Sequence, residues 1–265
     1  LADDARCSSI HWLFTTAVEQ QRLELLGFAP RASFQFHWRN RGWSSWDEFL
    51  AALTSRKRKQ LRKERERARA AVDTVEMVPA RDLDTTARDD LDRFYRATID
   101  DHGGSDYLRP GFFHLLAERM PDEMLLCQAM KGGRRVAGAL FFDSGKALYG
   151  RYWGADERVE LLHFEVAYYA GIERCVQRGL SLFEAGAQGE HKLLRGFEPT
   201  RTRSAHWCRA PRFDAAVRDF LTRERDAVVA QMLPTSAWLH IGPRGLGRWF
   251  EDACAATSFP TERAR

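Results

Sequence analysis

The sequence predicts a mixed α+β fold in which helices flank a central sheet, and three patterns indicate it. Apolar and polar residues alternate over residues 31–39, as in a half-buried strand. Residues 124–153 contain three short apolar runs separated by glycine-containing turns, which is typical of an antiparallel meander. Residues 161–178 carry apolar side chains at helical spacing, and Gly179 follows as a helix-ending residue.

The remaining elements are predicted from the same kinds of signal. The segment 45–48 is a capping box, and the residues after it are good helix formers, so we expect one long helix from Ser45 through residue 69. The other expected strands are 8–15, 72–78, 180–184 and 201–209. The other expected helices are 17–26, 91–101, 111–119 and 214–232, with a short helix or turn at 190–196.

Composition limits the classes of protein that the chain can be. The 265 residues are 44% hydrophobic, enough for one large domain or two small ones. There is no apolar run of about eighteen residues and no secretory signal pattern, so we predict a cytoplasmic protein without a transmembrane segment. The five cysteines lack metal-ligand spacing, and His163, Glu165 and His191 form no HExxH pattern. We therefore expect buried free thiols and no metal.

Positive charge is concentrated in one segment. The formal net charge is +4, but residues 56–69 alone hold nine Arg or Lys and two Glu. Such a run is typical of a solvated helix face or a helix that links domains; alternatively, it contacts the phosphates of a nucleic acid or another anion. No aromatic residue interrupts it, so base stacking is not indicated. The candidate contact residues are Arg56, Lys57, Arg58, Lys59, Arg62 and Lys63.

The order of elements suggests a specific architecture. From residue 72 it is strand, two helices, three strands, helix, strand, loop and strand, which is the order of the GNAT-type acyltransferase fold. In that fold a mixed sheet splays open and a ligand lies in the gap. The chain starts at Leu1, so we expect that the front half of a first GNAT-like domain is missing. The expected units are 1–43, the back half of that domain; 44–71, a basic linking helix; 72–212, a complete GNAT-like domain; and 213–265, a C-terminal helix and tail.

Chemistry-bearing residues are concentrated at 182–197, which contains three glycines, two carboxylates, a histidine and a lysine. Together with four other motifs, this stretch resembles the FemAB-like, peptidoglycan biosynthesis/recognition family of bacterial GNAT proteins. The likeness covers roughly residues 1–215, and the motifs lie at 36–40, 55–59, 149–154, 162–165 and 183–192.

The resemblance implies a transferase that forms an amide bond. Fem-type relatives have two tandem GNAT domains and move an amino acid from aminoacyl-tRNA to the amine of a cell-wall precursor peptide. Lys192, with Gly196 and Phe197 after it, resembles a family lysine, and we expect its ammonium to stabilise the oxyanion of the transition state. The candidates that orient or deprotonate the amine are Glu184, Glu190 and His191. The candidates that line the substrate groove are His37, Arg151, Tyr152, His163, Glu165 and Gln188.

Two donors and one non-catalytic alternative remain open. The GNAT turn that binds the pyrophosphate of acyl-CoA is matched only in its first half, by residues 151–156, and Asp156 and Glu157 would repel phosphate. We therefore favour an aminoacyl-tRNA donor, with tRNA as a partner, over acyl-CoA, and no cofactor is certain. The acceptor would be an amine of a small molecule or peptide. The alternative is a recognition module that binds a cell-wall peptide or an anionic ligand.

Overall fold

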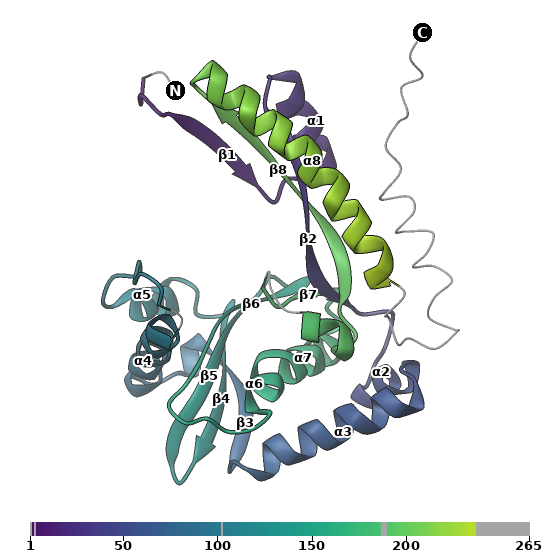
Figure 1. Cartoon of the computed structure of the whole chain (residues 1–265). Coiled ribbons are helices and arrows are strands. Elements are labelled where there is room, and N and C mark those ends of the chain that lie inside the picture. Colours follow the sequence, from purple (N-terminus) through teal and green to yellow (C-terminus); the bar gives the residue numbers. More distant parts are fainter. Residues whose placement is uncertain (1, 3, 102, 187–189, 237–265) are drawn as a thin grey trace.

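The computed structural model describes residue 2 and residues 4–101, 103–186 and 190–236. Their strands form one eight-stranded sheet in the order β1-β8-β2-β7-β6-β5-β4-β3 (Figure 1). The strands are β1 (Ser9–Leu13), β2 (Ala29–Arg39), β3 (Thr74–Pro79), β4 (Met124–Lys131), β5 (Arg134–Asp143), β6 (Ala147–Ala155), β7 (Leu182–Glu184) and β8 (Glu198–Cys208). The helices are α1 (Ala17–Leu25), α2 (Trp46–Ala52), α3 (Ser55–Ala70), η1 (Ala80–Asp82), α4 (Thr85–Asp101), α5 (Phe112–Arg119), α6 (Leu162–Phe164), η2 (Glu165–Tyr169), α7 (Ala170–Arg178), η3 (Glu190–Arg195) and α8 (Pro211–Ser236).

The sheet opens between β6 and β7. The predicted meander of β4, β5 and β6 is antiparallel, and β6 and β7 form the parallel pair of the sheet. A parallel pair needs a crossover connection, which the continuous helical segment α6-η2-α7 supplies. The pairing between β6 and β7 ends where Tyr149 faces Glu184. Beyond this point β6 continues to Ala155, and no described strand pairs with it on the side of β7. This arrangement is the predicted GNAT-type acyltransferase fold, a mixed sheet flanked by helices.

Strands β3 to β7 and the helices that cover them form the larger part of the molecule, which we call the body. Two hydrophobic cores hold it together, one on each face of the sheet. Phe141, Leu148 and Phe183 pack against the segment α6-η2-α7 and helices α2 and α3. On the other face, Leu126 and Leu140 pack against α4 and α5. Three cysteines of the body and the outer strands, Cys127, Cys175 and Cys208, are buried free thiols, as predicted.

The prediction of one long helix from Ser45 is wrong, because α2 and α3 are separate helices. Leu53 has an extended backbone and is buried, so the chain bends there to place its side chain in the core. Arg58 stabilises the bend by donating hydrogen bonds to the carbonyls of Leu50 and Leu53, at 3.1 and 3.3 Å. Helix propensity alone does not show this, since every residue of the basic run favours a helix.

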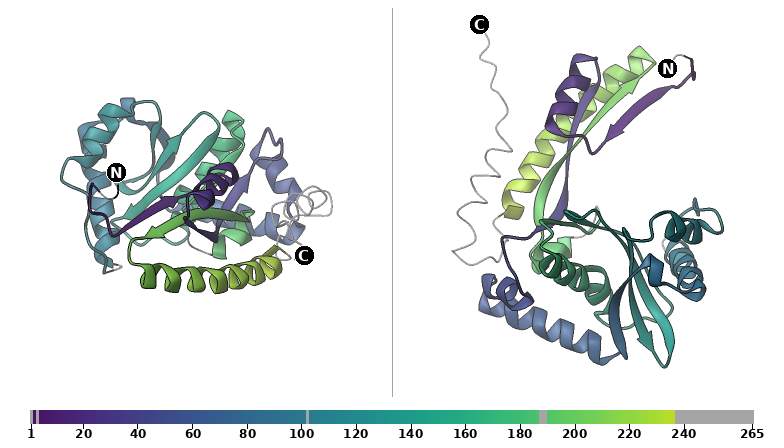
Figure 2. Two further views of the ribbon diagram at one scale, coloured as in Figure 1. Left: turned by 90° about the horizontal axis from the view of Figure 1, so that it is seen from above. Right: turned by 180° about the vertical axis from the view of Figure 1, so that it is seen from behind.

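Strands β1, β2 and β8, which come from both ends of the chain, form one end of the sheet, and we call this part the arm. β2 pairs with β7 and β8, and β1 pairs with β8, all antiparallel. Helix α8 packs along one face of β2 and β8, and the opposite face looks across an open space toward the body (Figures 1 and 2). The proposed boundaries at residues 43, 71 and 212 remain a prediction. None of the described helices is both long and apolar enough to cross a membrane.

Candidate active site

Lys192 lies in a tight turn at the opening between β6 and β7. Strand β7 ends at Glu184, and Gly186 follows with φ of +81°, a left-handed conformation that glycine adopts without steric cost. Helix η3 then brings the chain back, so that Lys192 Nζ donates a hydrogen bond to the carbonyl of Gly186 at 2.6 Å. The ammonium is therefore held at the end of β7.

The surroundings of Lys192 are unusual for a lysine. Its exposed fraction is 1%, and burial lowers the pKa of its ammonium to about 8. The ring of Tyr168 lies 5.8 Å from Nζ. In the described part of the chain, the carbonyl of Gly186 is the one hydrogen-bond acceptor of Nζ. Burying such a charge is unfavourable for folding, so a functional reason for it is expected.

His37 and Glu184 form a second group of titratable side chains at the opening. They face each other directly across β2 and β7, with 3.6 Å between His37 Nε2 and Glu184 Oε1. Burial, and then the charges of Arg39 and Lys192, lower the pKa of His37 to about 4. Burial raises the pKa of Glu184. His37 is therefore a neutral imidazole at neutral pH.

Two more histidines lie near Lys192: His191 directly precedes it in η3, and His163 lies in α6 of the crossover segment. Tyr168, in the π-helical turn η2, shares a hydrogen bond of 3.0 Å with His191 Nε2. His163 packs against Tyr168, with ring centroids 5.2 Å apart, and lies 6.3 Å from the ring of His191. Burial, then the charge of His191, lowers the pKa of His163 to about 4, and burial also lowers that of His191. Turns of this π-helical kind are frequent at functional sites.

A buried ion pair fixes the turn that carries Lys192. Arg195 donates hydrogen bonds of 2.8 Å to the carbonyl of His191 and to the carboxylate of Glu64, and its guanidinium lies 3.4 Å from the ring centroid of Phe164. Glu64 also accepts a hydrogen bond from Tyr169. Although burial opposes it, these donors lower the pKa of the Glu64 carboxyl. The turn is thus locked to α3 and to η2.

Three residues of the site were not predicted from the sequence, namely Glu64, Tyr168 and Arg195. A signal for Glu64 was present, because it lies three residues after Leu61 and four before Ala68, two buried residues of α3. Residues at these spacings share one side of a helix. Glu64 therefore had to point inward, unlike most of the charged residues around it.

Several predicted site residues lie apart from Lys192. Glu165 is fully buried and accepts hydrogen bonds from Arg65 and Arg69, at 3.2 and 2.7 Å, so it docks α3 instead of lining a groove. Arg151 lies at a bulge of β6, and both it and Tyr152 contact Tyr107, toward α5. Two further candidates lie outside what the structure describes: Gln188 entirely, and Glu190 in its side chain.

The basic helix α3 divides its cations between two environments. Lys57 is buried and donates to Gln60 at 3.0 Å, Arg58 donates to carbonyls in and just after the last turn of α2, and Arg62 pairs with Asp47 at 2.9 Å. The other three candidate anion contacts, Arg56, Lys59 and Lys63, are exposed and have no partner among the described residues.

The segment 151–156, which resembles half of an acyl-CoA turn, is mostly strand. Residues 151–155 belong to β6, and the Asp156 carboxylate pairs with Arg93 at 2.8 Å. Glu157 pairs with Lys131 at 3.0 Å. Both acids are thus neutralised by cations of this chain, which weakens the argument that they repel phosphate.

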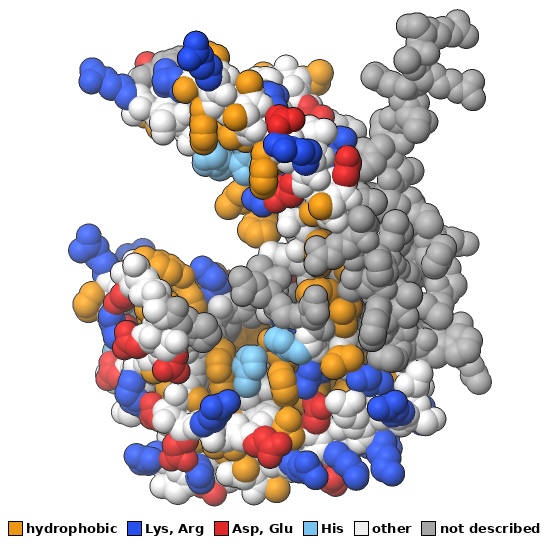
Figure 3. Space-filling model, in the orientation of Figure 1, with side chains coloured by type: hydrophobic (Ala, Val, Ile, Leu, Met, Phe, Trp, Pro, Cys, Tyr) orange, Lys and Arg blue, Asp and Glu red, His pale blue; other side chains and the backbone are white. Residues whose placement is uncertain are grey.

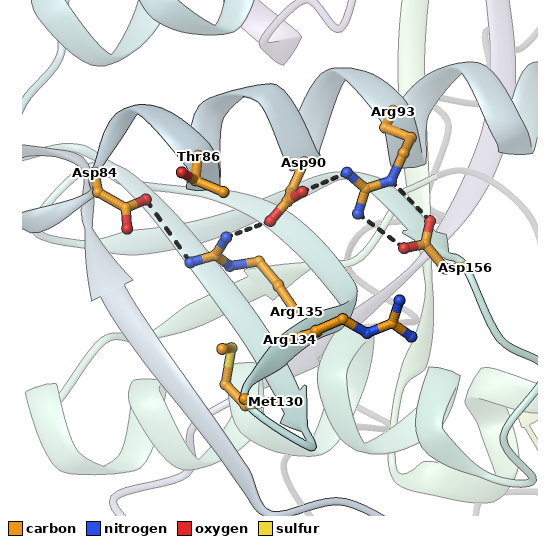
Figure 4. Close-up of a pocket in the computed structure, with 9 residues that line it drawn as sticks. Asp84, Thr86, Asp90, Arg93, Met130, Arg134, Arg135 and Asp156 are labelled. Carbon is orange, nitrogen blue, oxygen red and sulfur yellow. Dashed lines mark hydrogen bonds and ion pairs between the residues drawn. The ribbon is translucent and has the colours of Figure 1, made fainter.

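A cavity of about 490 Å³ near the start of α4 is a separate feature. Figure 4 shows Arg135 between Asp84 and Asp90, and Arg93 between Asp90 and Asp156. These ion pairs join α4 to β5 and to the end of β6. The cavity therefore belongs to the packing of α4, on the sheet face opposite the crossover helix.

The surface between the arm and the body is deeply hollowed; histidine and apolar side chains border the hollow on the arm, and further histidine side chains lie on the front face of the body (Figure 3). No group of three or more His, Cys, Asp or Glu able to hold a metal occurs among the described residues.

The solved structures that share this fold include the following two. One is the C-terminal DUF2156 domain of a putative lysylphosphatidylglycerol synthetase from Agrobacterium fabrum, with a TM-score of 0.51 and 14% identity, covering 91% of this chain and 76% of that one. The other is L-PGS from Bacillus licheniformis, with a TM-score of 0.54 and 10% identity, covering 83% and 75%.

No curated protein matches the sequence significantly. A match to a protein family is nevertheless extensive, since it spans residues 1–238 and includes every motif named above. The family is described as acting in peptidoglycan biosynthesis/recognition. The chain belongs to this FemAB-like family.

Proposed function

We propose that the protein is a transferase that forms an amide bond in the opening between β6 and β7, moving an aminoacyl or acyl group from an activated ester to an amine. The observation that carries this is Lys192, a buried ammonium with one backbone partner at the end of β7. Family membership supports a cell-wall precursor or peptide as the amine. An aminoacyl-tRNA donor is favoured and acyl-CoA is the alternative.

In this mechanism the neutral amine attacks the carbonyl carbon of the ester, and the carbonyl oxygen becomes an oxyanion. The ammonium of Lys192 stabilises that oxyanion, an effect of about 3 kcal/mol for one such group. The Glu184 carboxylate, whose pKa burial raises, accepts the proton of the amine, and the neutral imidazole of His37 lies 3.6 Å from it. The ester C–O bond then breaks, and the Glu184 carboxyl returns its proton to the leaving oxygen.

The test uses mass spectrometry of a peptidoglycan precursor peptide incubated with the protein and either aminoacyl-tRNA or acyl-CoA. Lys192→Ala should lower turnover at least about tenfold, because it removes the oxyanion donor. Lys146→Ala is the matched control, since Lys146 is exposed in the turn before β6. Unchanged turnover in Lys192→Ala would remove Lys192 from the mechanism.

The pH profile adds a second readout. Because the pKa of Lys192 is about 8, its positive charge, and with it the turnover, should be lost as the pH rises through 8. In Lys192→Arg the charge persists, so this decline should disappear from whatever turnover remains. Binding of the precursor without any turnover would instead support a recognition module.

A further inference from the structure

One side of α3 presents a row of cations to solvent. Arg56, Lys59, Lys63 and Arg67 are all exposed, and none has a partner among the described residues. Their spacings of three, four and four residues place them along the same side of the helix. At about 1.5 Å per residue, the row is about 16 Å long. We call these four residues the outer row.

The other cations of α3 are engaged within the protein. Arg65 and Arg69 hold Glu165 and Glu173, while Lys57, Arg58 and Arg62 have the partners described above. These contacts account for how α3 is docked. The outer row contributes nothing to that docking, so packing does not explain its charge.

The outer row is turned away from the Lys192 turn. The buried side of α3 carries Leu61 and Ala68, and Glu64 beside them reaches Arg195. A nucleic acid lying along the outer row would have to pass around the helix to bring an ester to Lys192. A flat anionic surface needs no such access. The row also contains no aromatic side chain for stacking on bases.

We propose that the outer row docks the protein on an anionic lipid surface. Its side chains are long, flexible and unpaired, so they attract phosphate headgroups as point charges without a shaped pocket. Each cation near such a surface strengthens binding about fivefold, and salt weakens the effect. This inference does not depend on the proposed chemistry at Lys192.

The experiment is co-sedimentation of the protein with phosphatidylcholine vesicles that contain or lack phosphatidylglycerol. The wild type should bind only the anionic vesicles, and the variant that changes all four residues of the outer row to Gln should lose at least about a hundredfold in affinity. The matched control changes four exposed cations outside α3 to Gln, namely Arg22, Arg109, Lys146 and Arg158. It loses the same charge and should bind nearly as the wild type does. Equal losses in both variants would overturn the proposal, because net charge alone would then explain binding.

A competition with tRNA separates the two kinds of anion. We expect the wild type to stay on anionic vesicles when tRNA is added at the same phosphate concentration. We also expect the outer-row variant to keep any tRNA binding that the wild type has. Loss of tRNA binding in that variant, with vesicle binding unchanged, would overturn the proposal and assign the row to nucleic acid. Lys192→Ala should bind vesicles as the wild type does. A failure of the membrane-docking proposal can therefore be told apart from a failure of the proposed chemistry at Lys192.

Discussion

Arg195 and Glu64 form a buried ion pair with 2.8 Å between Nη2 and Oε2, although 131 positions separate them in the chain. The pair joins the turn that carries Lys192 to helix α3. Arg195 also holds the carbonyl of His191, the residue directly before Lys192. The position of the candidate catalytic lysine therefore depends on a helix that the sequence suggests is only a linker.

We expect Arg195→Met and Glu64→Gln each to lower the free energy of unfolding by about 3 kcal/mol, because each leaves the other partner buried without its counter-charge. The double variant should lose less than the sum of the two, since it removes the pair as a unit. Urea unfolding of all four proteins measures this coupling. Strictly additive losses would show that the pair does not act as a unit.

The fold class followed from local patterns, whereas the site depended on long-range contacts. The alternation at residues 31–39 and the meander at 124–153 are visible because side-chain period and turn residues are local properties. Membership of the family followed from motifs that include Lys192. Neither kind of signal shows that Glu165 pairs with Arg65 and Arg69, since nothing in a helix register specifies which cations of another helix a buried carboxylate will meet.

The break at Leu53 was missed for a related reason. Helix propensity describes each residue by itself, and the cost of bending the chain is offset by burying Leu53 and by the hydrogen bonds of Arg58. Arg151 and Tyr152 were placed correctly on a strand, but their contacts with Tyr107 depend on a bulge that the sequence does not mark.

Gly154 is expected to tolerate no side chain. A Cβ there would lie 2.2 Å from the backbone carbonyl oxygen of Phe94, where α4 packs against β6. We expect Gly154→Ala to destabilise the protein by about 3 kcal/mol, because the strand and the helix would have to separate. Gly104→Ala is the control, since its Cβ would meet only the side chain and backbone of Ile99 at 3.5 Å or more. Thermal unfolding of both variants measures the difference, and similar midpoints would contradict the close packing.

Acid should destabilise the protein through the half-buried His163. The pKa of His163 is about 4 in the folded state, against about 6.5 in an unfolded chain, so the unfolded state binds more protons between these values. Stability should therefore fall as the pH drops from 6.5 to 4, by up to about 3 kcal/mol for this residue. His163→Phe should reduce the slope of unfolding free energy against pH by about one proton. An unchanged slope would mean that His163 titrates normally.

Lys192 offers the clearest contrast between a structural and a functional role. Its pKa is about 8 when folded, while an unfolded lysine titrates near 10.4, so burial of its charge costs about 3 kcal/mol of stability at neutral pH. Lys192→Met should thus raise the free energy of unfolding although it removes the hydrogen bond to Gly186. Between pH 8 and 10 the unfolded state binds the additional proton, so the wild type should gain stability and approach the variant. Lys146→Met, at an exposed position, should change little at any pH. Urea unfolding at pH 7 and pH 10 measures both effects. If Lys192→Met is less stable than the wild type at pH 7, the lysine stabilises its turn. Its burial would then need no functional reason, and the main physical argument for Lys192 as an oxyanion donor would be lost.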